Sequence, residues 1–367
     1  MKLKVARQPF LDAVGIAGAV ATGRSGRPVL TCLLMRTGEG SIELQGTDLE
    51  VSVRRTVRGA EIEEAGALAL PAGPLQSILR EARSEDVVLT SDGPLLHITS
   101  RDGEFKLVGE DPLEFPDIPK ADPSGFVELA GATFARDLER VELAAARDVG
   151  RYAVNGVLFV VGKELLEMVA TDGRRLAYVH REMPGLLAEL AQALAPLKGV
   201  NLFKKSITGG DELVGLHVEP GQVTLRTSTT EVMARAIEGD FPDYRRVLGR
   251  DFTLQGRLET AAFTAAIRQA AIMAGDETRA IHMRFNEQGV VEVSSRQEGR
   301  GEVRVTLAAE HDGAGVAMIL NPDFLVEFTR VPLPETLEVR FNRGEGPLIF
   351  RPDADYLYLV MPVTTYQ

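Results

Sequence analysis

The sequence contains one cysteine, no tryptophan and no long apolar run, and these absences exclude several classes of protein. Cys32 has no second cysteine with which to form an internal disulfide, which is typical of a chain in a reducing compartment. No segment approaches the ~18 consecutive apolar residues of a membrane-spanning helix, and the first residues lack the apolar core of a signal peptide. We therefore expect a cytoplasmic protein that does not enter a membrane.

The chain also lacks the basic excess of a general nucleic-acid binder. Its 53 acidic and 41 basic side chains give a net charge of −12, so any contact with DNA must be confined to a local surface. Only 6% of the 367 residues are aromatic, which is too few for an extended base-stacking platform. At 44% hydrophobic and 26% charged residues, the composition is that of a globular protein with two or three domains.

No arrangement typical of a catalytic or metal site is present. The five histidines are His97, His180, His217, His282 and His311, and none has the HExxH or HxxxH spacing of a metal-binding helix. The sequence contains no nucleophile elbow, no P-loop and no dinucleotide-binding glycine motif. We therefore expect no catalytic residue, no metal and no cofactor.

Internal repetition divides the chain into three copies of about 125 residues. Pro71, Pro196 and Asn321 follow one another at steps of 125 residues, and the tripeptide that begins at Phe115 recurs at Phe241. A repeat of this length is long enough to bury its own core, unlike the short repeats of a solenoid. The sequence thus predicts three similar domains, at residues 1–121, 122–249 and 250–367.

Each copy is expected to contain two short helices. An apolar stripe at i, i+4, i+7 and i+11, typical of an amphipathic helix, runs through residues 10–21, 134–145 and 263–274. Alanine and glycine are frequent here, so the helices can pack closely. A second helix should begin near Pro71, Pro196 and Pro322, because proline suits the first turn of a helix.

The rest of each copy is expected to form strands. Period-two patterns predict strands at residues 87–90, 95–99, 223–227 and 290–294. Asp92-Gly93 and Asp102-Gly103 are typical of tight hairpin turns. Strand-rich copies with two helices each indicate an α+β fold.

Two aspartates recur at equivalent positions, since Thr47-Asp48 returns as Thr171-Asp172. A catalytic acid would rarely be duplicated in two domains and absent from the third, so we interpret both as turn residues. A hydrolase with paired carboxylates on a duplicated β-rich scaffold is one alternative. A structural or adhesive repeat protein is another, which the absence of a secretion signal disfavours.

The charge is divided unevenly between the expected helices and the remaining chain. The helical windows contain 12 basic and 10 acidic residues, a net charge of +2, so the remainder has −14. One interpretation is an ordinary solvated face, and the other is a helical surface that faces phosphates. The candidate phosphate contacts are Arg24, Arg80, Arg83, Lys198, Lys204 and Lys205.

Four segments together resemble the bacterial DNA sliding clamp, the β subunit of DNA polymerase III. They are NGVLFVV at 155–161, VATDGRRLAYV at 169–179, FPDYRRVL at 241–248 and YLYLVMPV at 356–363. The resemblance implies an α+β fold of three repeated clamp domains, each with two helices backed by antiparallel sheet. It also implies that two subunits assemble into a closed ring with the helices around the hole.

The same resemblance implies a function without catalysis. The chain would be a processivity factor for DNA replication, a ring-shaped homodimer that encircles and slides along duplex DNA. Its partners would be double-stranded DNA without regard to sequence, a second copy of the chain, the clamp loader, replicative and repair DNA polymerases, ligase and mismatch-repair proteins. No membrane partner is expected.

In the family, partner proteins insert short peptide motifs into a hydrophobic pocket between the second and third domains. The matching positions are Val154, Thr171, Gly173, Arg174, Arg175, Leu176, Pro242, Arg246, Val247, Val360, Met361 and Pro362. The alternative for Val360 and Leu359 is that they are core residues of the last strand. Arg174 replaces the usual histidine, and the tail continues as Thr364-Thr365-Tyr366-Gln367 rather than ending in a short basic-apolar pair.

Ring closure in the family pairs the first domain of one subunit with the third domain of the other. The matching positions are Ile78, Phe105 and Leu107 in the first domain, and Ile272 and Met273 in the third.

Overall fold

The computed structural model describes residues 1–21, 26–147, 154–162, 164–183, 190–275, 279–287, 289–344 and 346–363. The chain forms two compact units, each built from two separate segments. Unit 1 comprises Met1–Ala135 and Lys198–Ala236, and unit 2 comprises Arg136–Leu197 and Ile237–Gln367. None of the described helices is both long and apolar enough to cross a membrane.

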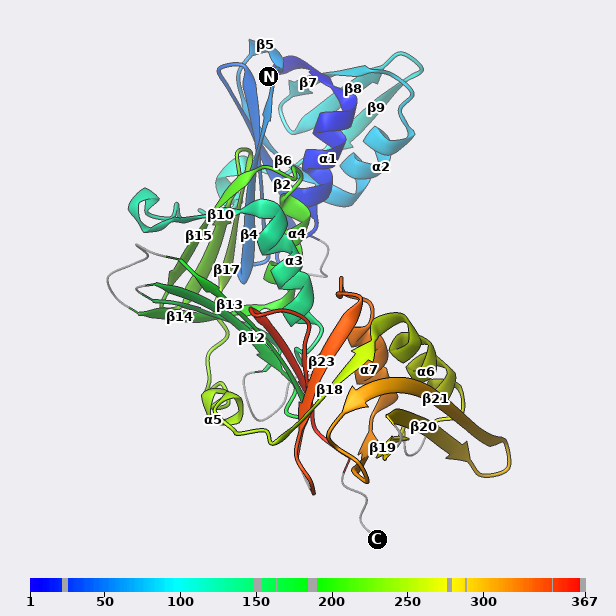
Figure 1. Cartoon of the computed structure of the whole chain (residues 1–367). Coiled ribbons are helices and arrows are strands. Elements are labelled where there is room, and N and C mark those ends of the chain that lie inside the picture. Colours follow the sequence, from blue (N-terminus) through cyan, green and yellow to red (C-terminus); the bar gives the residue numbers. More distant parts are fainter. Residues whose placement is uncertain are drawn as a thin grey trace. The chain divides into compact units, whose positions relative to one another are not determined.

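Unit 1 contains two antiparallel sheets (Figure 1). One has the order β5-β1-β7-β8-β9, with β5 (Glu61–Glu64), β1 (Lys2–Ala6), β7 (Asp86–Asp92), β8 (Leu95–Ser100) and β9 (Gly103–Val108). The other has the order β10-β15-β16-β17-β4-β3-β2-β6, with β10 (Val127–Ala130), β15 (Leu213–Glu219), β16 (Gln222–Arg226), β17 (Thr230–Arg235), β4 (Val51–Arg58), β3 (Ser41–Thr47), β2 (Cys32–Gly38) and β6 (Ala67–Pro71). Helices α1 (Arg7–Gly18) and α2 (Ala72–Glu81) pack together, and α1 covers β2, β3 and β4.

Helices α3 and α4 and three short 3-10 turns are the other helical pieces described in this part of the chain. Helix α4 (Leu197–Ser206) belongs to unit 1 except for its first residue, and α3 (Gly131–Glu142) begins in unit 1 and ends in unit 2. Short 3-10 turns are η1 (Pro28–Thr31), η2 (Pro112–Glu114) and η3 (Pro123–Gly125).

Unit 2 contains one twelve-stranded antiparallel sheet. Its order is β14-β11-β12-β13-β25-β24-β23-β18-β21-β20-β19-β22. The strands are β11 (Gly156–Val161), β12 (Leu165–Thr171), β13 (Arg175–Glu182), β14 (Ala191–Pro196), β18 (Leu254–Glu259), β19 (Ile281–Asn286), β20 (Val290–Gln297), β21 (Gly301–His311), β22 (Ala317–Leu320), β23 (Thr336–Phe341), β24 (Leu348–Arg351) and β25 (Tyr356–Val360). Helix α6 (Thr260–Ile272) packs on β18, β20 and β21 and against α7 (Pro322–Phe328), and α5 (Arg245–Leu248) is a single turn.

Strand pairing joins neighbouring sequence copies into continuous sheets. In unit 1, β17 pairs with β4, so that Val232 lies opposite Val53. In unit 2, β13 pairs with β25, so that Leu176 lies opposite Leu359. The compact units therefore follow the sheets and divide the central copy, whereas the boundaries 1–121, 122–249 and 250–367 stay a prediction.

The predicted helical stripes are buried, but each helix begins three residues before its stripe and ends two or three residues before the stripe does. Phe10, Val14 and Ala17 lie in α1 and are almost completely buried, and the equivalent residues of α3 and α6 behave in the same way. The last member of each stripe, Ala21, Ala145 or Ala274, lies beyond the helix end and is still buried. The apolar pattern placed the helix ends too far along the chain, because the buried turn after each helix continues the apolar face of that helix.

The second helix of each copy begins near the predicted proline, but only Pro322 occupies the first turn. There, the Asn321 side chain accepts a hydrogen bond of 2.8 Å from the Asp323 N–H and caps α7. Pro71 and Pro196 instead end β6 and β14, opposite Cys32 and Gly156, immediately before α2 and α4.

The predicted strands and hairpins are present. Residues 87–90, 95–99 and 290–294 lie within β7, β8 and β20, and most of 223–227 lies within β16. The turn at Asp92-Gly93 joins β7 to β8, with Gly93 at a φ of +55°, and Asp102-Gly103 joins β8 to β9. The expected α+β class, with helices backed by antiparallel sheet, is thus confirmed.

Gly46 allows α1 to lie directly against β3. A Cβ atom at this position would be 2.3 Å from the Ala17 carbonyl oxygen and 2.9 Å from the Val20 side chain. Backbone cannot yield as a flexible side chain can, so any larger residue must displace the helix from the sheet.

Replacing Gly46 with alanine should therefore lower the free energy of unfolding by about 1–3 kcal/mol, measured by urea denaturation. Gly38 in β2 is the matched control, because a Cβ atom there meets nothing closer than the Ser41 hydroxyl at 3.8 Å. Equal effects of the two substitutions would contradict a specific contact between α1 and β3.

Candidate functional site

The predicted phosphate-contacting residues that the structure describes all lie in unit 1. Helix α4 has three lysines and no acidic residue, which makes it the most positive of the described helices. Arg80 is exposed in the last turn of α2, and Arg83 is exposed just after that helix. Arg24 lies outside the described residues.

Lys198 is paired with a carboxylate rather than free. Its ammonium donates to Asp48 and, at 3.4 Å, to the Val20 carbonyl oxygen. Asp48 also accepts hydrogen bonds from the backbone N–H groups of Glu50 and Val51, at 3.0 and 2.7 Å, which confirms its predicted role as a turn residue. Burial alone would raise the pKa of Asp48, but Lys198 and these N–H groups outweigh it and lower the pKa.

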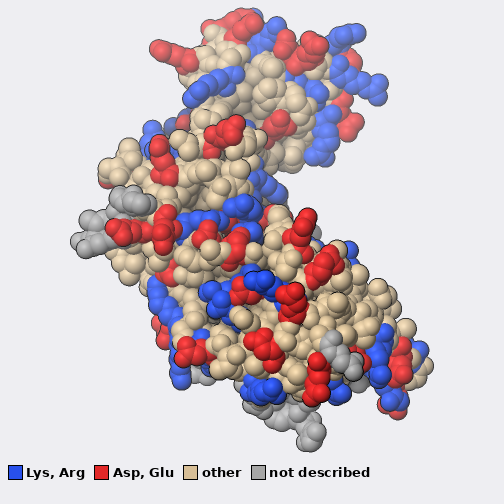
Figure 2. Space-filling view, viewed as in Figure 1, with Lys and Arg blue, Asp and Glu red and all other residues tan. Residues whose placement is uncertain are grey.

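Basic and acidic side chains are interspersed over the face seen in Figure 2. This mixture agrees with the net charge of −12 and shows no broad positive field in that view. A positive contact surface must therefore be local, as the lysines of α4 are.

In unit 2, the residues predicted for the peptide pocket begin at the turn between β12 and β13. Asp172 accepts from the N–H groups of Arg174 and Arg175 at 2.9 and 3.0 Å, so the second repeated aspartate is also a turn residue. The Thr171 hydroxyl accepts from the Gly173 N–H at 3.0 Å, and Gly173 has a φ of +85°. The turn therefore presents Arg174 to solvent.

Arg175 is a structural residue of this turn. Its guanidinium is 6% exposed, bonds Asp172 at 3.0 Å, pairs with Glu327 of α7 and lies 4.5 Å from the Phe324 ring centre. Burial would lower the pKa of Arg175, but Tyr358 and Glu327 raise it. The arginine thereby fixes the start of β13 against α7.

The chain end lies beside this turn. Pairing of β13 with β25 places Val360 opposite Arg175, and the Met361 N–H donates to the Arg174 carbonyl oxygen at 2.8 Å. Val360 and Leu359 are buried, which agrees with their interpretation as core residues of the last strand. Met361, in contrast, is 37% exposed. Met361 and the half-buried Pro362 therefore offer the apolar surface here, and Thr364 to Gln367 lie outside the described residues.

The segment FPDYRRVL packs on the same sheet. Val247 and Phe241 contact a core cluster that includes Leu176, Leu359 and Tyr244. Pro242 is half-buried, Arg246 is exposed, and Val154 is buried before β11. We name the residues Arg174, Val247, Met361 and Pro362 the chain-end surface.

The predicted ring-contact residues lie at sheet and helix ends. Phe105 and Leu107 are on β9, the last strand of the five-stranded sheet, and Ile78 is half-buried on α2. Ile272 ends α6 and is 72% exposed, and Met273 follows it. These residues include apolar side chains that the described chain does not cover.

Family models match along nearly the whole chain. Residues 1–119, 128–243 and 245–364 match the N-terminal, central and C-terminal domains of the DNA polymerase III beta subunit. The chain belongs to this family.

Curated relatives and solved structures agree with the assignment. The beta sliding clamp of Streptomyces coelicolor is 28% identical over 381 residues, covering 99% of both chains, and that of Pseudomonas putida is 25% identical over 370 residues, covering 99% of this chain and 100% of the relative. The Thermotoga maritima DNA polymerase III beta subunit has a TM-score of 0.91 at 25% identity over 100% of both chains. The Bacillus subtilis sliding clamp, at 21% identity over 100% of both chains, has the same fold with a TM-score of 0.94.

The resemblance found in the sequence is thus confirmed, together with the fold of three clamp domains. Clamps of this family are non-catalytic processivity subunits of DNA polymerase III, so the expectation that the chain is not an enzyme is confirmed by its family. Within the described part of the clamp, no three His, Cys, Asp or Glu side chains are grouped as metal ligands would be.

Sequence reasoning missed a buried carboxylate that holds the segment FPDYRRVL to the sheet. Glu167 of β12 accepts from the hydroxyls of Tyr178 and Tyr244, at 2.8 and 2.9 Å, and from Arg245. Burial raises the pKa of both tyrosines and the bonds to Glu167 raise it further, so the hydroxyls stay protonated donors. The signal was present, because Glu167 interrupts an otherwise apolar strand.

Replacing Glu167 with glutamine should lower the free energy of unfolding by about 1–3 kcal/mol, because an amide cannot accept from all three donors. Urea denaturation measures the effect. Glu164, exposed before the same strand, is the matched control, and E164Q should change stability by less than about 0.5 kcal/mol. If E167Q were equally silent, the bonds would not fix the segment.

Proposed function

We propose that this clamp is a ring-shaped homodimer that encircles duplex DNA, slides along it and tethers DNA polymerase and other DNA-processing proteins. The observation that carries the proposal is the succession of three clamp-domain matches along one chain. A topological link needs no strong grip on phosphates, which agrees with a net charge of −12.

Two open strand edges support closure by a second copy. β9 ends the five-stranded sheet, and its Val108 is 66% exposed. On one side of β21, residues 301–308 pair with β20. On its other side, β18 pairs only with residues 309–311. An edge that is both apolar and unpaired is a template for another strand. We propose that β9 and Ile78 of one subunit meet β21, Ile272 and Met273 of the other.

The chain-end surface is our proposed site for partner peptides. Thr171, Gly173, Arg175, Leu176, Val154, Pro242, Arg246 and Val360 are the other residues that the resemblance assigns to this site. Exposed Met361 is suited to an apolar anchor, and Arg174 and Arg246 are suited to acidic flanking residues. The proposed partners are the clamp loader, replicative and repair polymerases, ligase and mismatch-repair proteins.

We place this function in the cytoplasm. Cys32 is buried and free, as in a protein kept under reducing conditions. The proposed DNA contacts are Arg24, Arg80, Arg83, Lys204 and Lys205, with Lys198 partly neutralised by Asp48. Contacts to phosphates alone carry no sequence information, so binding should be independent of sequence.

Replacing Ile272 with glutamate should convert the dimer to a monomer, because the new charge would be buried without a partner. Sedimentation equilibrium measures the mass. Leu213, 61% exposed on β15, is the control, and L213E should remain a dimer. Dimeric I272E would contradict the proposed closure.

Replacing Met361 with aspartate should weaken binding of an apolar polymerase-tail peptide at least tenfold, while the dimer mass is unchanged. Leu190, 69% exposed elsewhere in unit 2, is the matched control, and L190D should bind the peptide normally. Unchanged peptide affinity in M361D, measured by calorimetry, would place the peptide site elsewhere.

The function itself is tested by primer extension on a long circular template with a clamp loader and polymerase, under single-encounter conditions. Adding the clamp should lengthen the products manyfold, and I272E should not. Products of unchanged length with the wild-type clamp would refute the processivity function.

A further inference from the structure

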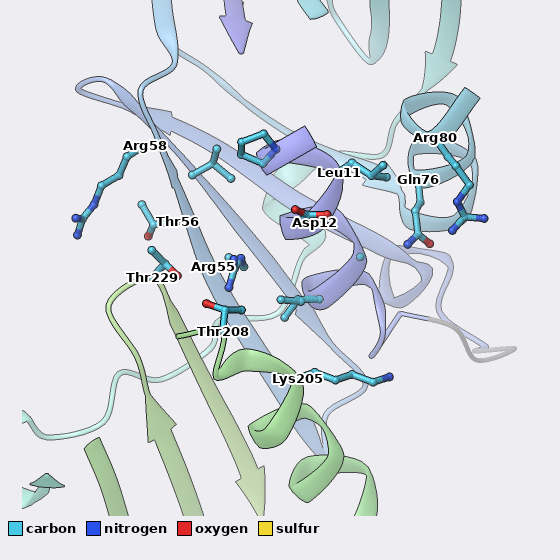
Figure 3. Close-up of a pocket in the computed structure, with 14 residues that line it drawn as sticks. Leu11, Asp12, Arg55, Thr56, Arg58, Gln76, Arg80, Lys205, Thr208 and Thr229 are labelled. Carbon is cyan, nitrogen blue, oxygen red and sulfur yellow. The ribbon is translucent and has the colours of Figure 1, made fainter. Parts of the chain in front are cut away.

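A cavity of about 820 Å³ opens in unit 1 beside α1 (Figure 3). Strand β4 and helix α1 provide most of its lining, and side chains of α2, the end of α4 and the turn at Thr229 complete it. The sequence singled out Arg80 and Lys205 at this place, but not Arg55. The size is that of a site for a nucleotide-sized group.

Arg55 lies on the helix-bearing face of the eight-stranded sheet. Side chains alternate along β4, so Arg55 points to the same side as the buried Val53 and Val57, against which α1 packs. Arg54 points to the opposite side, where it bonds Glu231 at 2.8 Å. Two consecutive arginines therefore serve different faces.

The charge of Arg55 is only partly compensated. Its guanidinium donates to the Thr230 hydroxyl, and among the described residues no carboxylate is within ion-pairing distance of it. Burial lowers the pKa of Arg55, although Asp12 and Glu212 act in the opposite direction. Four of its five N–H donors are available to an oxyanion.

The other charged residues that line the cavity are also mostly cationic. Three cationic residues, Arg55, Arg80 and Lys205, line the cavity with a single carboxylate, Asp12, which itself accepts from Gln8 at 2.8 Å. Arg58 also borders the cavity, but its position on β4 directs its side chain to the other face, where it donates to the Ser228 carbonyl oxygen at 3.4 Å. Arg80 and Lys205 are exposed and have no ion pair within the described ranges. In a chain of net charge −12, this local excess of positive charge is distinctive.

Polar and apolar groups are both present around these cations. Thr208 and Thr229 offer hydroxyls, and Leu11 and Ile16 offer an apolar wall. A phosphodiester has the matching pair of features, since its oxygens accept from guanidinium and hydroxyl groups and its sugars pack on aliphatic side chains.

We propose that this cavity binds a phosphate group of the DNA backbone, with the half-buried Arg55 as the anchor and the exposed Arg80 and Lys205 at the rim. DNA as the source of the phosphate rests on the function proposed above. Such a phosphate-binding site gives the sliding clamp a preferred contact with DNA. This contact is stronger than an exposed lysine alone provides.

The test compares Arg55→Gln with Arg36→Gln. Arg36 is exposed on β2, and its register with Glu43 and Thr56 places it on the opposite face of the same sheet. Binding of a short fluorescent duplex by the full-length protein is measured by anisotropy over a series of KCl concentrations. R55Q should weaken binding several-fold and reduce the slope of log K against log[KCl] by about 0.9, and R36Q should leave both unchanged.

An unchanged slope in R55Q, or an equal loss in R36Q, would overturn the proposal. Arg55→Lys keeps the charge and serves as the check on folding, so it should retain the slope while losing affinity from the forked contact. If R55K lost the slope as R55Q does, the effect would be structural and the phosphate-binding site would be refuted.

A second measurement separates DNA from free phosphate. Melting of the wild-type protein is compared in inorganic phosphate and in chloride at equal ionic strength, and we expect no difference. A rise in melting temperature that disappears in R55Q would assign the cavity to a free anion and overturn the DNA assignment.

Failure of this inference is distinguishable from failure of the proposed function. Retention of the wild-type clamp on closed circular DNA depends on the ring and not on Arg55. Normal retention with an unchanged R55Q slope overturns the cavity proposal alone, whereas loss of retention overturns the ring.

Discussion

Main-chain pairing between neighbouring copies is the interaction on which the rest of the structure depends. The β17–β4 and β13–β25 ladders convert strands from different copies into two continuous sheets. The first ladder sets Arg55 beside Thr230, where the cavity of unit 1 forms. The second sets Met361 against Arg174, at the chain-end surface. Both candidate sites therefore exist only because strands distant in sequence are hydrogen-bonded.

Much of the fold could be predicted from local patterns, but not these ladders. The stripe beginning at Phe10 and the turn at Asp92-Gly93 identify their elements because period and turn chemistry are local properties. Pairing of Val232 with Val53 has no local signature, since any alternating strand could accept that neighbour. Helix ends were also misplaced, because Ala21 stays buried after α1 has ended.

Turn residues could be predicted from the sequence, whereas the environments of individual charged side chains could not. Asp48 and Asp172 were correctly interpreted as turn residues, and the peptide site beside Asp172 stays a prediction. The alternation of β4 separates Arg54 from Arg55 by face, but it does not show that one is paired with Glu231 and the other faces a cavity. Nor does the sequence show that Lys198 is held by Asp48. The helical charge excess thus resides in fewer free groups than a count suggests.

The central claim is topological, namely that the protein holds DNA by surrounding it. The most direct measurement loads the clamp onto a nicked circular duplex with a clamp loader, isolates the complex and then cuts the circle once. The account predicts stable retention on the circle and rapid release from the free ends of the linear product. Retention that is equal before and after cutting would show that the protein grips DNA chemically and would contradict the ring.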